Sequence, residues 1–200
     1  MATDKPFSEA CQRNQQPICS VLATYLKGPV RVLEIGSGTG QHGAYVCQHL
    51  PKITWQPSEL AEALPGIELW RNAVALGNLL PPLALDVNRR PWPFDSKFDA
   101  VFTANTVHFV AWSTVVNLFH GAADALVEGG HFLIYGPFND NGRYTSPGNE
   151  QLDHWLKRRD PQSGIKDRAA IIELANAVGL SHSETHSMPA NNEILSFKAG

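Results

Sequence analysis

The stretch Val30–His42 reads VRVLEIGSGTGQH and joins a short apolar segment, a glycine-rich loop and the start of a helical segment. Val30–Ile35 has the length and composition of a buried strand, and Gln41–Leu50 has the pattern of a helix that ends before Pro51. A glycine loop between a strand and a helix presents backbone N–H groups at the helix N-terminus, where polar ligands bind. This stretch therefore predicts a nucleotide-type binding loop.

On both sides of the loop, strand-like and helix-like segments continue to alternate, which is typical of a sheet covered by helices on both faces. Further strands are expected at 53–56, 83–87, 98–104 and 131–135, with a closing hairpin at 183–188 and 193–197. Helices are expected at 17–27, 67–76, 113–127, 150–159 and 167–178. The fold class is therefore α/β, a Rossmann-like doubly wound sheet, and residues 1–200 are expected to form one domain.

The composition is that of an ordinary soluble protein. Its 200 residues carry 16 Lys and Arg against 19 Asp and Glu, and this net charge of −3 gives no sign of a nucleic-acid partner. No run approaches the ~20 apolar residues that span a bilayer, and residues 1–17 lack the apolar segment of a secretory signal. Three cysteines without a CxxC pair favour reduced thiols. We expect a cytoplasmic protein without a membrane partner, as monomer or homodimer.

The spacing of the glycines distinguishes between two cofactor classes. A dinucleotide fingerprint requires a small residue after Gly36-x-Gly38-x-x, but Gln41 stands there and the spacing is G-x-G-x-G. Glu34 lies two residues before Gly36, where a carboxylate would repel a pyrophosphate and suits a ligand that carries an ammonium and a sulfonium. The loop thus favours S-adenosylmethionine, with S-adenosylhomocysteine as product, over NAD.

Two further acids stand where expected strands end. Glu59 follows the second strand at about the distance where an acid receives ribose hydroxyls. Asp86 ends the third strand, where a carboxylate can accept a hydrogen bond from an adenine amino group. Each acid alone is as well explained by a solvated strand end, but together with the loop they predict a nucleoside-type ligand.

The sequence resembles class I S-adenosylmethionine methyltransferases and, within them, the small DUF938 family, also called methyltransferase-like 26. The resemblance covers nearly the whole chain and rests on the motifs RN at 13–14, PI at 17–18, LEIGSGTGQH at 33–42, WQPS at 55–58, LDV at 85–87, YGPF at 135–138, RDP at 159–161 and MPANN at 188–192. It implies about seven strands, mostly parallel, with an antiparallel C-terminal strand. It implies no substrate, because the family is biochemically poorly defined.

Two positions depart mildly from the family pattern: Glu59 stands where Asp is expected, and Asn105-Thr106-Val107-His108 where Asn-Met-Ile-His is usual. The resemblance also places Arg13 and Asn14, ahead of the first expected helix, over the amino-acid part of the cofactor. The cofactor-binding residues expected from motif and resemblance together are Arg13, Asn14, Glu34, Gly36, Ser37, Gly38, Gly40, Gln41, Glu59, Asp86, Val87 and Asn105.

Residues that act on the methyl acceptor leave a weaker signature, because methyl transfer needs alignment more than acid–base help. His108 follows the fourth strand and can act as a base, although a hydrogen-bonded wall residue explains it equally well. Tyr144 lies in the long loop 136–149, whose composition is that of a lid. We expect His108 and Tyr144 to be the catalytic residues and the acceptor, a small molecule, to bind between His108 and that loop.

Several alternatives remain open from the residues alone. Asn105 lacks a following Pro-Pro-Tyr, so methylation of base amines is not supported. His182 and His186 fall in an expected strand without a third ligand, and we expect no metal site. A protein that binds the cofactor without transferring its methyl group fits the sequence as well. An NAD-dependent oxidoreductase is disfavoured by Glu34 and Gln41.

Overall fold

The computed structural model describes residues 5–200. Its helices are α1 (Glu9–Tyr25), α2 (Gln41–His49), α3 (Leu64–Val74), α4 (Trp112–Ala125), α5 (Pro147–Arg159) and α6 (Arg168–Ala177), with short 3-10 turns at Ala61–Ala63 and Pro189–Asn191. Its strands are β1 (Arg31–Ile35), β2 (Thr54–Glu59), β3 (Leu83–Ala84), β4 (Phe98–Ala104), β5 (Leu126–Gly136), β6 (Leu180–Met188) and β7 (Asn192–Ala199). They pair in the order β3-β2-β1-β4-β5-β7-β6, with β7 antiparallel to β5 and β6. The expected mostly parallel, seven-stranded α/β sheet with an antiparallel last strand is confirmed.

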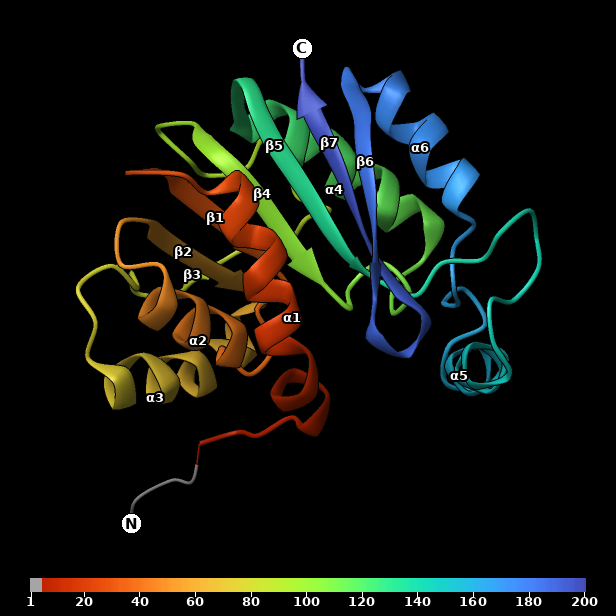
Figure 1. The fold of residues 1–200 in the computed structure, drawn as a ribbon, viewed down its shortest axis with the longest axis horizontal. Coiled ribbons are helices and arrows are strands. Elements are labelled where there is room, and N and C mark those ends of the chain that lie inside the picture. Colours follow the sequence, from red (N-terminus) through yellow and green to blue (C-terminus); the bar gives the residue numbers. More distant parts are fainter. Residues whose placement is uncertain (1–4) are drawn as a thin grey trace. The chain divides into compact units, whose positions relative to one another are not determined.

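The chain divides into two compact units, which are described separately. The first runs up to Asp86 and includes Phe98–Phe102. In it β1 pairs in parallel with β2, which pairs with β3, and α2 packs against α1, α3 and β2 (Figure 1). Trp55 is fully buried at the centre of this unit. A side chain at Gly43 would approach the Trp55 ring to 2.8 Å, so the close packing of α2 on β2 requires glycine there.

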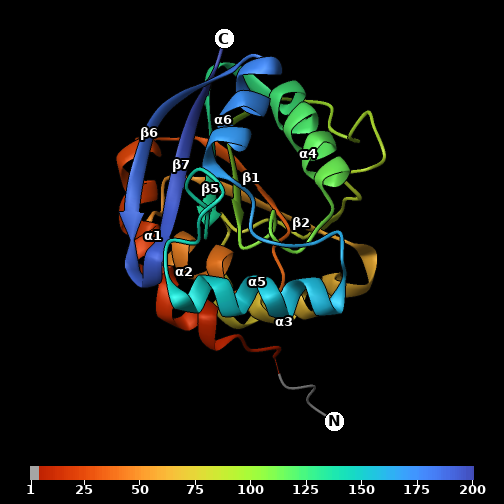
Figure 2. The same cartoon turned by 90° about the vertical axis from the view of Figure 1, so that its right-hand side faces the viewer.

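The second unit comprises Val87–Lys97 and Thr103–Gly200. Strand β7 is its centre and pairs along its length with β5 on one side and β6 on the other. Helices α4 and α6 lie on the same face of these strands (Figures 1 and 2). Phe119 of α4 meets Phe132 and Phe197 of the strands edge-on, at centroid distances of 5.2 and 6.1 Å, and this aromatic cluster forms the core beneath α4.

The first helix differs most from its prediction. It was expected at 17–27, with Pro17 in its first turn, but α1 begins at Glu9 and contains Pro17 in its interior. Ser8 is the N-cap, and its hydroxyl accepts a hydrogen bond from the Cys11 N–H. With this cap and an acid in the first turn, the helix starts one residue after Ser8 and accommodates the proline. Residues 13 and 14 consequently lie within α1 and do not precede it.

Strands β3 and β5 and helix α5 are among the other elements whose bounds differ from the prediction. Strand β3 has two residues where five were expected, because Pro81 and Pro82 before it supply no N–H groups to a ladder. Strand β5 begins at Leu126, five residues before its predicted start. Helix α5 begins at Pro147, because the Ser146 hydroxyl accepts a bond from the Asn149 N–H and caps it. The connection between β5 and α5 is therefore residues 137–146, shorter than the loop expected at 136–149.

Candidate functional site

The glycine loop of the first unit is held in a shape that only glycine adopts easily. Gly36, Gly38 and Gly40 have φ angles of 71°, 54° and 86°, in the left-handed region. The N–H groups of Gly36 and Ser37 both donate to the Ser58 carbonyl of β2 at 3.1 Å, which ties the turn after β1 to the neighbouring strand. The spacing G-x-G-x-G thus reflects a backbone path with three left-handed residues in five.

The last two glycines serve different purposes. A Cβ at Gly40 would lie 3.0 Å from Ile67 of α3, so this glycine permits close packing inside the unit. A Cβ at Gly38 would meet nothing within 4 Å, and this residue is exposed. Gly38 is therefore where the loop backbone is open to a ligand.

Glu34 near the end of β1 is almost completely buried, with 1% of its surface exposed. Its Oε2 accepts hydrogen bonds from the Ser37 hydroxyl at 2.8 Å and from the Trp55 indole N–H at 2.9 Å. Burial raises the pKa of Glu34 to about 7, although these two bonds oppose the shift. Glu34 thereby links Ser37 of the loop to Trp55 of β2, and it holds a proton more readily than an ordinary acid.

Glu59, the last residue of β2, is bound directly to the loop. Its Oε2 accepts from the Gly38 N–H at 3.0 Å and its Oε1 accepts from the Leu60 N–H at 2.8 Å. The side chain of Leu60 is 45% exposed beside this carboxylate. Sequence reasoning identified Glu59 but missed Leu60, whose only signal is an apolar residue directly after an acid at a strand end.

The segment before α1 is joined to the start of α2. The Gln41 Oε1 accepts a bond from the Ser8 N–H at 2.5 Å, and the Gln41 Nε2 donates to the Ser8 carbonyl at 3.3 Å. The Thr39 hydroxyl also donates to Gln41 Oε1, at 3.0 Å. Gln41 is buried and so holds two separate segments together. The contact of Ser8 was not predicted, because no pattern in the sequence links it to Gln41, which lies 33 positions later.

Of the two α1 residues expected at the cofactor, one reaches the loop region. The Asn14 Oδ1 lies 2.8 Å from the His42 Nε2, and burial lowers the pKa of His42 to about 4. The His42 ring is therefore neutral near pH 7 and donates to Asn14. Arg13 is exposed and pairs with Glu9 one turn earlier at 3.4 Å, so the structure does not bring it to the loop.

The remaining expected cofactor residues fall on both sides of the unit boundary. The Leu85 N–H donates to the Glu59 carbonyl at 2.9 Å, which places Asp86 near the end of β2 in the first unit. Val87 and Asn105 belong to the second unit. Asn105 has a φ of 56°, and its N–H donates to the Tyr135 carbonyl at 2.9 Å, so it makes the turn that follows β4.

His108, in the second unit, is 2% exposed, and its Nδ1 has no hydrogen-bond partner in the part of the chain that the structure describes. Burial, aided by the nearby Lys166 charge, lowers the pKa of His108 to about 4. A Cβ at Gly136 would lie 3.5 Å from the Nδ1, so the glycine at the end of β5 leaves space next to it. A buried polar atom without a partner is uncommon in a folded protein, which makes His108 a candidate site residue.

Tyr144, the second expected catalytic residue, makes a structural contact. Its hydroxyl donates to the Asp153 Oδ2 at 2.7 Å, and this bond raises the pKa of Tyr144. The Asp153 side chain is fully buried, and it also accepts from Lys157 Nζ and from the Ile165 N–H, each at 2.7 Å. Burial opposes the charge, but the bonds from Lys157, Tyr144 and Ile165 lower the pKa of Asp153 below its ordinary value.

The connection 137–146, expected to be a lid, is tied down along its length. The Asn139 N–H donates to the Lys166 carbonyl at 3.0 Å, and the Gly142 N–H donates to the Asp167 carboxylate at 2.6 Å. These contacts anchor it to the residues before α6, and the Tyr144–Asp153 bond anchors it to α5.

Within residues 5–200, no three His, Cys, Asp or Glu side chains gather in a way that would hold a metal ion. No helix in the same range has the length and hydropathy needed to cross a membrane.

Comparison with solved structures places the fold among methyltransferases. A putative O-methyltransferase from Nostoc punctiforme superposes with a TM-score of 0.83 at 19% identity, over 94% of this chain and 56% of that one. An O-methyltransferase family protein from Burkholderia thailandensis gives 0.81 at 17% identity, over 96% and 58%. The protein PigF, solved with SAH, gives 0.80 at 15% identity, over 93% and 56%. The chain thus spans less than two thirds of the length of these structures.

At these identities the likeness establishes the fold alone. Family membership rests on the sequence itself, since a family model described as a protein of unknown function matches residues 5–199, nearly the whole chain. This protein is therefore a member of the DUF938 family.

Proposed function

We propose that this chain is an S-adenosylmethionine-dependent methyltransferase whose acceptor is a small molecule, and that residues 1–200 act as one methyltransferase domain. The observation that carries the proposal is the loop of the first unit, where an exposed Gly38 backbone stands next to the Glu59 carboxylate. The fold shared with O-methyltransferase family proteins and with PigF, which was solved with S-adenosylhomocysteine, supports it.

The residues of the first unit suit the parts of this cofactor. Glu59 offers carboxylate oxygens to ribose hydroxyls, and Asp86, near the end of β2, can accept from an adenine amino group. The exposed Leu60 side chain provides an apolar contact for the purine. Gly38 allows the backbone to come close to the ligand without a side chain in between.

When bound, the cofactor supplies a methyl group on a positively charged sulfur. Glu34 is almost completely buried, and its Oε2 accepts from Ser37 and Trp55, so it does not face the cofactor as a simple counter-charge. We propose that Glu34 fixes the loop, and that the bond between Asn14 and His42 and the bonds between Ser8 and Gln41 hold α1 against the start of α2.

We further propose that the second unit binds the acceptor and that His108 is its base. The His108 ring is uncharged near pH 7, and in the tautomer that carries its proton on Nε2 the unpartnered Nδ1 is the atom that accepts the proton of an acceptor hydroxyl. Tyr144, whose hydroxyl is held by Asp153, is in this proposal a positioning residue that keeps the connection 137–146 in place.

The unpaired thiols of Cys11, Cys19 and Cys47 agree with a cytoplasmic location.

Titration calorimetry tests the cofactor. S-adenosylhomocysteine is expected to bind, and NAD is expected to bind far more weakly. Glu59→Ala should weaken S-adenosylhomocysteine binding by about 1–3 kcal/mol, the usual range for hydrogen bonds to a charged group. Glu62→Ala is the matched control, because this acid is exposed three residues later and should leave affinity unchanged. NAD binding as tight as that of S-adenosylhomocysteine would contradict the proposal.

A screen of small-molecule acceptors tests the activity, with release of S-adenosylhomocysteine as the signal. His108→Ala should abolish the release that any accepted compound supports. Cofactor binding without turnover on any acceptor would instead indicate a protein that binds S-adenosylmethionine without transferring its methyl group.

A further inference from the structure

Two aromatic side chains and an arginine form an exposed patch in the second unit. Phe109 follows β4, and Trp155 and Arg159 lie one turn apart on α5, the helix drawn along its length in Figure 2. The rings of Phe109 and Trp155 meet edge-on at a centroid distance of 6.3 Å. The guanidinium carbon of Arg159 lies 5.8 Å from the Phe109 centroid and 5.9 Å from the Trp155 centroid. We call these three residues the aromatic–arginine patch.

The patch has the surface and the charge to bind a ligand. Phe109 and Trp155 are 41% and 46% exposed, so both keep ring surface in contact with water. Lys157 on the same helix is paired with Asp153, whereas Arg159 forms no ion pair with any residue from 5 to 200. An exposed ring surface beside an unpaired cation is complementary to a flat molecule that carries a negative charge.

The patch is continuous with the proposed base. The Phe109 ring lies against the His108 ring, at a centroid distance of 4.6 Å. On His108, the Nδ1 faces Gly136 and lacks a partner among the described residues. A molecule on the patch therefore has a cation within reach, and it lies beside the Phe109 ring, which contacts the ring of the buried His108.

We propose that the aromatic–arginine patch binds the methyl acceptor and that this acceptor is an anionic phenol, a flat aromatic ring carrying a carboxylate and a hydroxyl group. This inference rests on the proposed function. Arg159 binds the carboxylate, and the rings of Phe109 and Trp155 contact the ring of the acceptor. The phenol loses its proton to His108 Nδ1, its oxygen forms the bond to the methyl carbon, and the electron pair of the broken carbon–sulfur bond stays on sulfur.

Calorimetry with two related probes, 3-hydroxy-2-naphthoate and 2-naphthol, in the presence of saturating S-adenosylhomocysteine tests the proposal. The first probe carries the carboxylate and the second lacks it. Trp155→Ala should weaken the binding of both about tenfold, because both lose ring contact. Arg159→Gln should weaken 3-hydroxy-2-naphthoate about tenfold and leave 2-naphthol unchanged.

Two matched controls separate the patch from general surface effects. Trp112 is equally exposed, at 42%, and makes no ring contact within the described chain, so Trp112→Ala should leave both affinities within about twofold of the parent. Arg158 precedes Arg159 in the last turn of α5, and Arg158→Gln should also leave both affinities within about twofold of the parent. Equal effects of Arg158→Gln and Arg159→Gln would reduce the result to net charge and overturn the proposal.

Other outcomes also decide the question. If S-adenosylhomocysteine binds but neither naphthalene probe does, this inference fails while the proposed function stands; if S-adenosylhomocysteine itself does not bind, the proposed function fails first. Sedimentation of the parent and of Trp155→Ala tests whether a second copy of the chain binds the patch instead. A dimer that Trp155→Ala dissociates would show that the patch is a protein interface and would overturn the proposal.

Discussion

The loop of residues 34–41 in the first unit and the segment of residues 137–167 in the second are both dense in hydrogen bonds, but they are built differently. The loop depends on backbone conformation and on contacts to the adjacent strand, such as the bonds of Gly36 and Ser37 to the Ser58 carbonyl. The segment depends on a buried side chain, Asp153, which collects bonds from three places in the chain. A loop with left-handed backbone angles requires glycines, and these can be recognised in the sequence. A buried aspartate cannot be told from an exposed one by sequence alone.

The largest effect should come from filling the open position of the loop. Gly38→Val places a branched side chain where the loop faces a ligand, at a φ of 54° that such residues rarely adopt. We expect S-adenosylhomocysteine affinity to fall at least about a hundredfold, roughly 2.7 kcal/mol or more. Calorimetry measures the affinity, and circular dichroism checks that the chain is folded.

Gly77→Val is the control for this substitution. Gly77 also has nothing within 4 Å of an added Cβ, but its φ is not in the left-handed region and it lies outside the loop. The affinity of Gly77→Val for S-adenosylhomocysteine should match that of the parent. Normal binding by Gly38→Val would show that the loop is not the cofactor site, and the contrast between the two regions would then lose its functional meaning.

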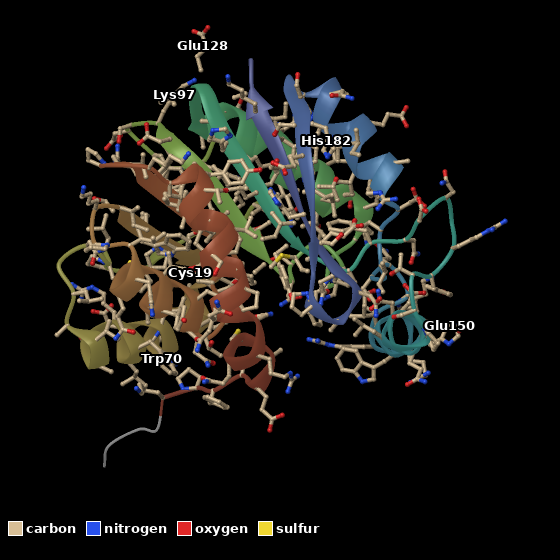
Figure 3. The ribbon with its side chains drawn as sticks, viewed as in Figure 1. Cys19, Trp70, Lys97, Glu128, Glu150 and His182 are labelled. Atoms are coloured by element: carbon tan, nitrogen blue, oxygen red, sulfur yellow. The ribbon has the colours of Figure 1, made fainter. Side chains whose placement is uncertain are left out.

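The segment of residues 137–167 should lose stability when its buried carboxylate is removed. Asp153→Ala leaves the buried Ile165 N–H without an acceptor and removes the partner of Lys157 and Tyr144, so we expect the free energy of unfolding to fall by about 3 kcal/mol. Urea denaturation measures it. Glu150→Ala, which replaces an exposed acid in the first turn of α5 (Figure 3), is the control and should change stability by about 0.5 kcal/mol or less. A loss of less than 1 kcal/mol for Asp153→Ala would mean that the segment is held by other contacts.

The same contrast explains which parts of the structure were predictable. The strand Phe98–Ala104 and the start of the helix at Gln41 agree with their predictions, because an apolar run and a glycine loop specify them locally. Helix α1 was misplaced by eight residues, because a proline was taken as its first turn when a serine cap lies earlier. The bonds between Ser8 and Gln41 were not predictable, since no local pattern identifies their partners.

The candidate site divides in the same way. The loop glycines, Glu34 and Glu59 were identified by spacing alone and lie together. Tyr144 was expected to be catalytic because it is a tyrosine in a polar loop, and its bond to Asp153 depends on a fold of the chain that composition does not encode. Arg13 shows that a residue within a family motif can still be exposed to solvent.

A pH-dependent effect is expected at the loop. The folded-state pKa of Glu34, about 7, is above its unfolded value of about 4.5, so folding favours the protonated acid. Its contribution to stability is complete below about pH 4.5 and is lost as the pH rises to about 7. The unfolding free energy of the parent minus that of Glu34→Gln should therefore fall by about 3 kcal/mol over this range and then level off. Urea titrations at several pH values measure it, and His42, present in both proteins, cancels in the difference. A flat difference would show that Glu34 is ionised in the fold throughout.

The smallest effect should come from removing one hydroxyl of the second region. Tyr144→Phe deletes the bond to Asp153 but leaves Lys157 and the Ile165 N–H in place, so we expect a loss of about 1 kcal/mol in the free energy of unfolding. Tyr45→Phe is the matched control, because the Tyr45 ring stacks on His49 while its hydroxyl has no hydrogen bond within the described chain. Once an acceptor is found, Tyr144→Phe should also keep most of the turnover that His108→Ala removes, since a positioning residue acts only through the segment it holds. A Tyr144→Phe protein of unchanged stability that had lost all turnover would reverse the assignment, because the hydroxyl would then serve the reaction and not the anchoring of residues 137–146.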